Sequence, residues 1–286
     1  MSAGPASIAV RAGDGHQWTL LGQVPRQPRA QLLWLPALGV AARHYLPLAQ
    51  ALAAHGIATW LHEWRGHGSS SLRPSRQLDW GYRELLTQDL PASLAALPDT
   101  PVLLGGHSLG GQLACCLAGL QPAQVAGIGL VAAGSPWWRG FPAPRRWLLP
   151  GAYRLLAWIA RRNGTLPGRR LGFAGTEARG LIHDWSQVGL TGRYAARGME
   201  LDLEAALAGV RMPLRAVLLE QDWLAPAGSL QALLARMPQA PAQVAMFNAD
   251  ALGARADHFA WMAQPGTVAA SLAALVEDQK KFCGGC

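Results

Sequence analysis

Short apolar runs alternate with segments of helical periodicity along most of the chain, and this alternation is the strongest constraint on its fold. Six runs before residue 135 have the length and apolar character of strands. The predicted strands are Ser7–Arg11, Trp18–Gln23, Gln31–Leu35, Ile57–Leu61, Val102–Leu104 and Val125–Ala132. Helices are predicted over Tyr45–His55, Tyr82–Leu97 (kinked by Pro91) and Leu109–Leu120. Such alternation predicts an α/β fold with a mostly parallel sheet and helices on both faces.

The alternation is broken once, by residues 135–203, a segment rich in Trp, Arg, Gly and Pro that we call the insert. Beyond the insert, the pattern resumes with the strands Leu214–Leu219 and Ala242–Phe247 and with a helical stripe after each. We therefore predict one core built from residues 1–134 and 204–279, interrupted by the insert after the sixth strand. Residues 280–286 are predicted to form a flexible tail.

Composition excludes several classes of protein. The 286 residues are 50% hydrophobic, which is enough to bury a large core and too much for a disordered chain. No uninterrupted apolar run approaches the roughly 18 residues needed to cross a bilayer. The first 15 residues lack a cationic start followed by an apolar run. We therefore expect no secretory signal and a cytoplasmic protein.

Two of the four cysteines, Cys283 and Cys286, form a C-x-x-C pair at the end of the sequence. Such pairs occur in redox and zinc sites, but no second pair and no histidine cluster lies near this one in the sequence. We interpret the pair as two reactive thiols in the tail. The sequence predicts neither a metal ion nor a cofactor.

The segment Gly106-His107-Ser108-Leu109-Gly110, which we call the elbow, follows a predicted strand and precedes a predicted helix. This is the setting that the G-x-S-x-G nucleophile motif requires, and it predicts a sharp turn with strained backbone at Ser108. The residues two before and two after the serine must be small, because side chains there would collide. Ser108 is thus the predicted nucleophile. A phosphate-binding P-loop is excluded because no G-x-x-x-x-G-K-[ST] occurs.

A serine hydroxyl needs a base, and in this setting the order along the chain is serine, acid, histidine. Only His183 and His258 follow Ser108. His183 lies inside the insert, whereas His258 follows the last strand, so His258 is the predicted base. The acid is expected just after the strand that follows the insert. Asp222 is preferred because it lies in the turn beyond that strand, and Glu220 is the alternative.

Two backbone N–H groups are needed to stabilise an oxyanion. One is predicted to be that of Leu109, directly after the nucleophile. The other is expected from the loop Pro36–Val40 after the third strand.

Taken together, these residues resemble the α/β-hydrolase superfamily of serine hydrolases. The resemblance is carried by the elbow, the turn Asp222–Pro226, His258 and the segment Arg65–Ser69, and it covers residues 31–133 and 214–276. It implies the α/β-hydrolase fold, with the insert in the place of the helical cap (lid).

The loop Pro36–Val40 most resembles that of a group of predicted bacterial α/β-fold hydrolases. Alignment of this loop with that of the superfamily implies that the second oxyanion donor is the N–H of Leu38. Two departures from the family pattern occur. Many relatives have His-Gly where this chain has Pro36-Ala37, and many have Asp where it has Glu63. We interpret Glu63, and likewise His67, as structural residues.

The insert carries most of the net charge of +8, because 11 arginines and three acidic residues occur between residues 135 and 200. It also contains five tryptophans, of which Trp137 and Trp138 are the predicted substrate-binding residues. The alternative is that these tryptophans pack the insert onto the core and that arginine stems cover them.

The function predicted from these features is cleavage of an ester, thioester or similar acyl bond of a small molecule. Acyl transfer by the same residues is a close alternative, and a non-catalytic binding protein is a more distant one. A weak contact of the Arg-rich insert with a membrane surface is also considered. No nucleic-acid partner is expected, because no recognised motif occurs.

Overall fold

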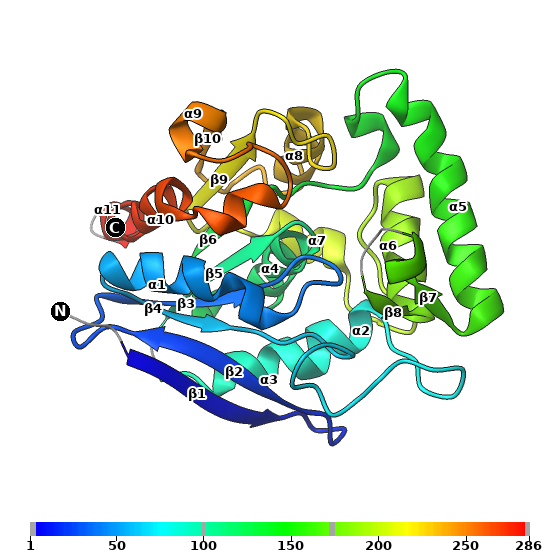
Figure 1. Cartoon of the computed structure of the whole chain (residues 1–286), viewed down its shortest axis with the longest axis horizontal. Coiled ribbons are helices and arrows are strands. Elements are labelled where there is room, and N and C mark those ends of the chain that lie inside the picture. Colours follow the sequence, from blue (N-terminus) through cyan, green and yellow to red (C-terminus); the bar gives the residue numbers. More distant parts are fainter. Residues whose placement is uncertain (1–3, 99–100, 172–174, 284–286) are drawn as a thin grey trace.

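The computed structural model describes residues 4–98, 101–171 and 175–283, and its centre is an eight-stranded sheet (Figure 1). The strands are β1 (Gly4–Arg11), β2 (Gln17–Val24), β3 (Ala30–Leu35), β4 (Ile57–Leu61), β5 (Val102–His107), β6 (Val125–Val131), β9 (Leu214–Leu219) and β10 (Ala242–Phe247). Their order in the sheet is β1-β2-β4-β3-β5-β6-β9-β10. Strand β2 is antiparallel to β1 and β4, and all other neighbours are parallel. The predicted strands and the mostly parallel α/β class are confirmed.

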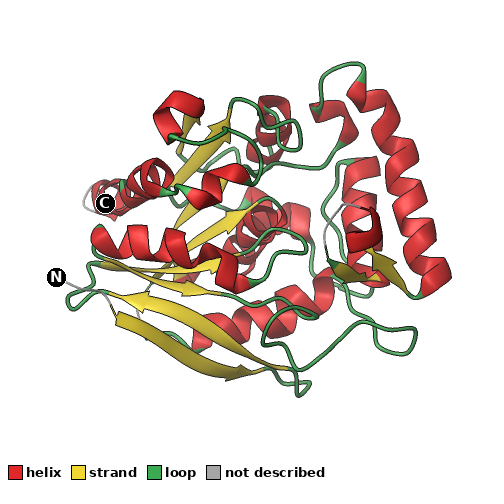
Figure 2. Cartoon of the chain, viewed as in Figure 1, coloured by secondary structure: helices red, strands yellow, loops and turns green. Residues whose placement is uncertain are grey.

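Helices cover both faces of this sheet (Figure 2). One face carries α1 (Leu46–Ala54), α10 (Gly266–Ala273) and α11 (Leu275–Cys283), with the short α9 (Ala249–Leu252) beside them. The other carries α3 (Leu90–Ala95), α4 (Leu109–Leu120), α7 (Leu203–Ala208) and α8 (Ala227–Leu234). Each face has its own hydrophobic cluster. Because both faces are buried, the central strands are apolar throughout instead of alternating with polar residues.

The helix predicted over Tyr82–Leu97 is present in three parts. It consists of α2 (Tyr82–Glu84), a π-helical turn (Leu85–Asp89) and α3. Pro91 has no N–H to donate to the preceding turn, and its ring crowds the carbonyl oxygen of that turn. A wider, π-helical turn before the proline removes the clash and the need for the missing hydrogen bond. The expected kink therefore takes the form of a π turn that begins before the proline.

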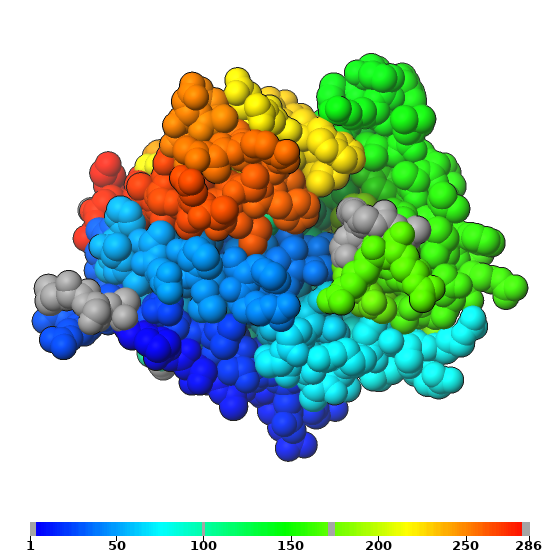
Figure 3. Space-filling view, in the orientation of Figure 1, coloured from blue at the N-terminus to red at the C-terminus, as the bar shows by residue number. Residues whose placement is uncertain are grey.

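The insert leaves the sheet after β6 and returns before β9. It contains α5 (Arg145–Asn163), α6 (Arg179–Thr191) and a hairpin of β7 (Thr165–Pro167) and β8 (Thr176–Ala178) that the sequence did not predict. In Figure 1 it lies at the end of the sheet toward which β3 and β5 point, and Figure 3 shows it as a raised body along one side of the core. The insert is therefore placed beside the carboxyl ends of the central strands, where ligands of such sheets bind.

The end of the chain differs from the prediction of a flexible tail over 280–286. Helix α11 continues to Cys283, so residues 280–283 are helical. Glu277 and Asp278 lie in its first turn, and Lys280 and Lys281 lie in its last. Both pairs of charges interact favourably with the helix dipole and so stabilise the helix. Residues 284–286, and with them half of the C-x-x-C pair, lie outside the described residues. Among the described residues, no helix is both long and apolar enough to cross a membrane.

Candidate active site

Ser108 joins β5 directly to α4 with a backbone conformation that side chains rarely adopt, φ 54° and ψ −118°. A Cβ atom at Gly106 would lie 2.3 Å from the carbonyl carbon of Gly110, and one at Gly110 would lie 2.1 Å from the oxygen of Leu35. Both positions therefore require glycine. The predicted sharp turn is confirmed, and strain of this kind is often retained at functional sites.

His258 and Asp222 meet beside this turn, although 36 residues separate them in the sequence. Nδ1 of His258 lies 2.8 Å from Oδ2 of Asp222, and both side chains are buried. The other carboxylate oxygen of Asp222 accepts hydrogen bonds from the N–H groups of Leu224 (2.8 Å) and Ala225 (3.1 Å). An acceptor at Nδ1 holds the ring with its proton on that nitrogen, which leaves Nε2 available as a base.

The alternative acid, Glu220, is exposed at the end of β9, and among the described residues its side chain has no hydrogen bond. The structure therefore brings Asp222 to the predicted base, and not Glu220. The other candidate histidine, His183, lies on α6 in the insert.

The ring of His258 packs against that of His107, with 4.7 Å between their centroids, so His258 lies next to the residue that precedes Ser108. No hydrogen bond joins the Ser108 hydroxyl to His258 within the described ranges. Such contacts are often long in ligand-free enzymes and tighten when substrate binds.

Tyr45 connects the elbow to the loop after β3, a link that the sequence did not predict. Its hydroxyl accepts a hydrogen bond from the N–H of Ala37 (2.9 Å) and lies 2.8 Å from Nδ1 of His107. Trp64 holds the same loop from another side by donating its indole N–H to the oxygen of Pro36 (2.9 Å). The loop therefore has anchors in place of the histidine that many relatives carry there.

His107 and Tyr45 are both fully buried, and burial sets their protonation. It lowers the pKa of His107 well below its usual range and raises the pKa of the Tyr45 hydroxyl. Both groups are therefore neutral at pH 7. A positive charge on His107 would repel an imidazolium at His258, so burial of His107 removes an obstacle to protonation of its neighbour.

Two backbone N–H groups remain available near Ser108. As the first residue of α4, Leu109 has no intrahelical acceptor for its N–H. The N–H of Leu38 makes no hydrogen bond to any described residue, whereas that of Ala37 is occupied by Tyr45. The close approach of Gly110 to Leu35 places this loop directly against the first turn of α4.

Glu63 and His67 have the structural contacts expected of them. One carboxylate oxygen of Glu63 accepts from the N–H of Ala42 (3.0 Å), and the other accepts from that of Ser69 (3.3 Å). Nε2 of His67 lies 3.1 Å from the carboxylate of Glu177 in the insert. These contacts fix the loop after β4 and connect it to the insert.

Trp137 and Trp138 are half-buried at the start of the insert. The ring of Trp137 packs on Gly192 at the end of α6, and Trp138 lies 5.7 Å from the ring of Trp147. The guanidinium of Arg139 lies over Trp138 at 5.1 Å. These contacts match the packing alternative, and the partial exposure of both rings leaves surface for a ligand.

Within the described residues, no group of three or more His, Cys, Asp or Glu side chains is arranged to hold a metal ion.

Comparison with known proteins connects this geometry to a family. The model of the serine aminopeptidase S33 family (Hydrolase_4) matches residues 26–249. The chain belongs to this family of α/β hydrolases. It is accordingly an α/β-hydrolase enzyme, as the elbow predicts. A search of curated proteins gave no match.

Solved structures share the fold over almost the whole chain. A hydrolase from Pseudomonas aeruginosa has a TM-score of 0.67 and 16% identity, covering 94% of this chain and 98% of that one. A thermophilic esterase from Thermogutta terrifontis has a TM-score of 0.62 and 17% identity, covering 97% and 98%. The thioesterase domain from the curacin biosynthetic pathway has a TM-score of 0.60 and 19% identity, covering 96% and 99%. At these identities the likeness is one of fold.

Proposed function

We propose that the protein is a serine hydrolase that cleaves an ester, thioester or similar acyl bond through Ser108, His258 and Asp222. The observation that carries this proposal is the buried pair of His258 and Asp222, 2.8 Å apart, beside a serine held in strained backbone conformation. The three residues come from the ends of β5, β9 and β10 or the loops after them, so they converge only in this fold.

The reaction begins when Oγ of Ser108 attacks the carbonyl carbon of the substrate and its proton passes to Nε2 of His258. Asp222 holds the imidazole and stabilises the imidazolium. The negative charge on the carbonyl oxygen is stabilised by the N–H groups of Leu109 and Leu38. The tetrahedral intermediate then expels the alcohol or thiol, which takes the proton from His258, and an acyl ester of Ser108 remains.

Water completes the cycle. His258 takes a proton from the water as its oxygen attacks the acyl ester, and it returns the proton to Ser108 as the carboxylic acid leaves. If an alcohol or a thiol replaces water in this step, the same residues perform acyl transfer, so the acceptor decides between the two activities.

In this proposal the insert acts as the cap, and the half-buried Trp137 and Trp138 provide apolar surface for the acyl group. The family name suggests aminopeptidase activity, but a positively charged amino group would be repelled by the Arg-rich insert. The esterase and thioesterase of the same fold favour an acyl substrate.

A panel of substrates tests this function. The panel comprises p-nitrophenyl esters from acetate to dodecanoate, acyl thioesters of N-acetylcysteamine and alanine p-nitroanilide. We expect turnover of esters or thioesters by the wild-type protein, loss of that turnover in Ser108→Ala, and no preference for the anilide. Preferential anilide cleavage would contradict the substrate class, and equal turnover by Ser108→Ala would contradict the mechanism.

A further inference from the structure

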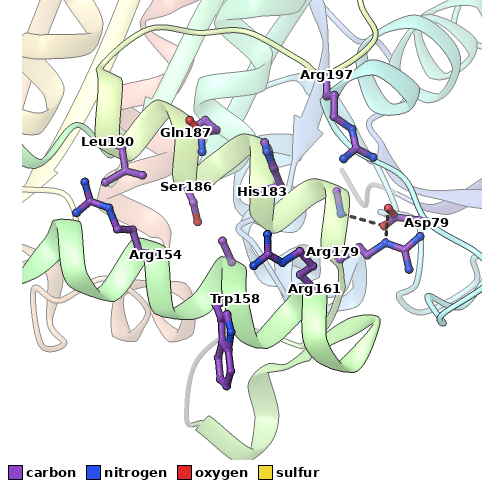
Figure 4. A pocket seen from close by; sticks show the side chains of 12 residues that line it. Asp79, Arg154, Trp158, Arg161, Arg179, His183, Ser186, Gln187, Leu190 and Arg197 are labelled. Carbon is purple, nitrogen blue, oxygen red and sulfur yellow. Dashed lines mark hydrogen bonds and ion pairs between the residues drawn. The ribbon is translucent and has the colours of Figure 1, made fainter.

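A cavity lies inside the insert, between α5 and α6 (Figure 4). Its volume is about 280 Å³, close to the lower end of the range for small-molecule pockets. Both helices line it, together with Arg197 beyond α6 and Asp79 in the loop before α2. Ser108, Asp222 and His258 do not line it, so the proposed reaction does not account for this cavity.

The lining of this cavity has an excess of positive charge. Four arginines, Arg154, Arg161, Arg179 and Arg197, line it together with one acidic residue, Asp79 (Figure 4). Asp79 is already engaged, because Nε of Arg179 lies 3.1 Å from it and the N–H of residue 180 donates to it. Like charges that share a cavity repel one another unless an anion lies between them.

Two of these arginines have free side chains. Within the described ranges, neither Arg161 nor Arg197 has a side-chain hydrogen bond or an ion pair. Asp184 is buried, interacts electrostatically with Arg197 and accepts hydrogen bonds from the backbone N–H groups of Tyr82 (2.9 Å) and Arg197 (3.4 Å). Both guanidinium groups thus keep donors available for a ligand.

A buried hydroxyl lacks a partner in the same cavity. Ser186 is 0% exposed, and among the described residues its Oγ has no hydrogen bond. Figure 4 shows this oxygen directed from α6 toward α5. Nδ1 of His183, one turn earlier, also lacks a hydrogen bond, and the carboxylate nearest to it is 3.9 Å away. Buried polar groups are almost always paired, so these two atoms keep hydrogen-bonding capacity for a ligand in the cavity.

We propose that this cavity binds the phosphate group of a small organic phosphate or of a lipid headgroup. Phosphate offers several acceptor oxygens and up to two negative charges, which match the forked donors of Arg161 and Arg197 and the Ser186 hydroxyl. A single carboxylate would neutralise less of the excess charge.

Both sources of phosphate suit the surroundings. The cavity is open to solvent, so a soluble phosphate ester can enter it. Helix α5 also exposes Trp147, Leu148 and Leu155 and has no acidic residue, which are features of helices that lie on anionic membranes. The chemistry at the phosphate is the same in either case.

Calorimetric titration of the full chain with inorganic pyrophosphate tests the proposal, with acetate at matched ionic strength as the control anion. Sedimentation with phosphatidylglycerol vesicles, compared with phosphatidylcholine vesicles, tests the lipid source. The variants are Arg161→Gln, Arg197→Gln and Ser186→Ala. Arg162→Gln is the matched control, because it removes the same charge from the same helix outside the cavity.

We expect the Kd for pyrophosphate to rise at least tenfold in Arg161→Gln and Arg197→Gln and by less than twofold in Arg162→Gln. Ser186→Ala should weaken binding about threefold while raising the urea midpoint of unfolding, because it removes an unpaired buried hydroxyl. This combination distinguishes a ligand site from a structural role. Parallel loss of phosphatidylglycerol binding in the same variants would assign the site to lipid headgroups.

Pyrophosphate binding without vesicle binding would support a soluble phosphate. The proposal would be overturned if neither probe binds more tightly than acetate or phosphatidylcholine. It would also be overturned if Arg162→Gln weakens binding as much as the cavity variants do. All of these measurements are independent of acyl hydrolysis, so a failure here leaves the proposed function intact.

Discussion

The edge of the sheet around Ser108 and the insert beside it differ in how their polar groups are held. Around Ser108, the side chains of Asp222, His258 and Tyr45 are buried, and each is hydrogen-bonded to a group from another element. In the insert, the guanidinium groups of Arg161 and Arg197 have no hydrogen bond or ion pair to a described residue, and Trp147 and Leu148 are 61% and 72% exposed. Groups that are already held in place can stabilise the charges that develop in a reaction without rearranging. A basic surface whose hydrogen-bond donors are free can instead attract and bind an anionic ligand.

The largest effect is expected at the acid. Asp222→Asn should lower kcat by about 10³-fold or more, because an amide can hold the imidazole of His258 in the wrong tautomer and cannot stabilise imidazolium. Steady-state kinetics on the best ester of the panel measure this effect. Glu220→Gln is the control, and its kcat should stay within about twofold of the wild type. The reverse ranking would assign the acid role to Glu220.

A smaller effect is expected when Tyr45 loses its hydroxyl. Tyr45→Phe releases the N–H of Ala37 and the ring of His107, so the loop that carries Leu38 is held less firmly. We expect kcat to fall by about 10- to 100-fold with little change in KM, since loss of a single oxyanion donor costs about 10²- to 10³-fold.

Tyr153→Phe is the control for this variant, because its hydroxyl donates to the oxygen of Pro136 inside the insert (2.5 Å) and not to the elbow. It should leave kcat on p-nitrophenyl acetate unchanged. Equal losses in the two variants would mean that Tyr45 acts through general stability and not through the loop.

The insert should control selectivity. Trp137→Ala or Trp138→Ala should cost about 1–3 kcal/mol in kcat/KM for long acyl chains and little for acetate, because a pocket distant from the reacting bond contributes binding energy only to substrates that fill it. Ser108 should react with a small phosphonate at the wild-type rate. Trp158→Ala, on the outer side of α5, is the control and should leave chain-length preference unchanged.

Two other results would change this view. Uniform loss on every substrate by a folded variant would make the insert part of the catalytic apparatus. No effect on any substrate would identify Trp137 and Trp138 as packing residues, as their contacts with Gly192 and Trp147 permit.

A last effect concerns the acid stability of the core and leaves activity at pH 7 aside. Burial lowers the pKa of His62 to about 3, so the folded protein keeps this ring neutral while the unfolded chain binds a proton as the pH falls below about 6.5. Its contribution to stability is therefore complete above about pH 7 and is lost progressively down to about pH 3. The expected loss is about 1.4 kcal/mol per pH unit within that window.

His62→Asn should lower the slope of the free energy of unfolding against pH by about 1.4 kcal/mol per pH unit. Asn keeps a hydrogen-bonding group for Ser93 but does not titrate. Urea unfolding at pH 7, 6 and 5 measures the slope. An unchanged slope would mean that other buried groups cause the acid sensitivity.

Much of the fold and of the site was predictable because local sequence determines it. Alternating periodicity located all eight strands of the sheet and the insert after β6. The elbow was predictable because its geometry restricts residues within a five-residue window. Asp222 and His258 were predictable because sites of such sheets form at the carboxyl ends of strands.

Contacts between distant segments were not predictable where neither partner follows a strand end. Tyr45 and His107 are 62 residues apart, and nothing in the helical stripe that contains Tyr45 distinguishes its hydroxyl from a packing ring. The only signal was a histidine beside the nucleophile in an apolar setting. The cavity between α5 and α6 also depends on how two helices pack, and composition indicated only that the insert is basic.

Labelling with a fluorophosphonate measures whether His258 and Asp222 activate Ser108. We expect one phosphonyl group per chain, located on Ser108 by peptide mass spectrometry, with no adduct in Ser108→Ala and strongly slowed labelling in Asp222→Asn. An adduct on another residue, or equal labelling of wild type and Ser108→Ala, would contradict this expectation.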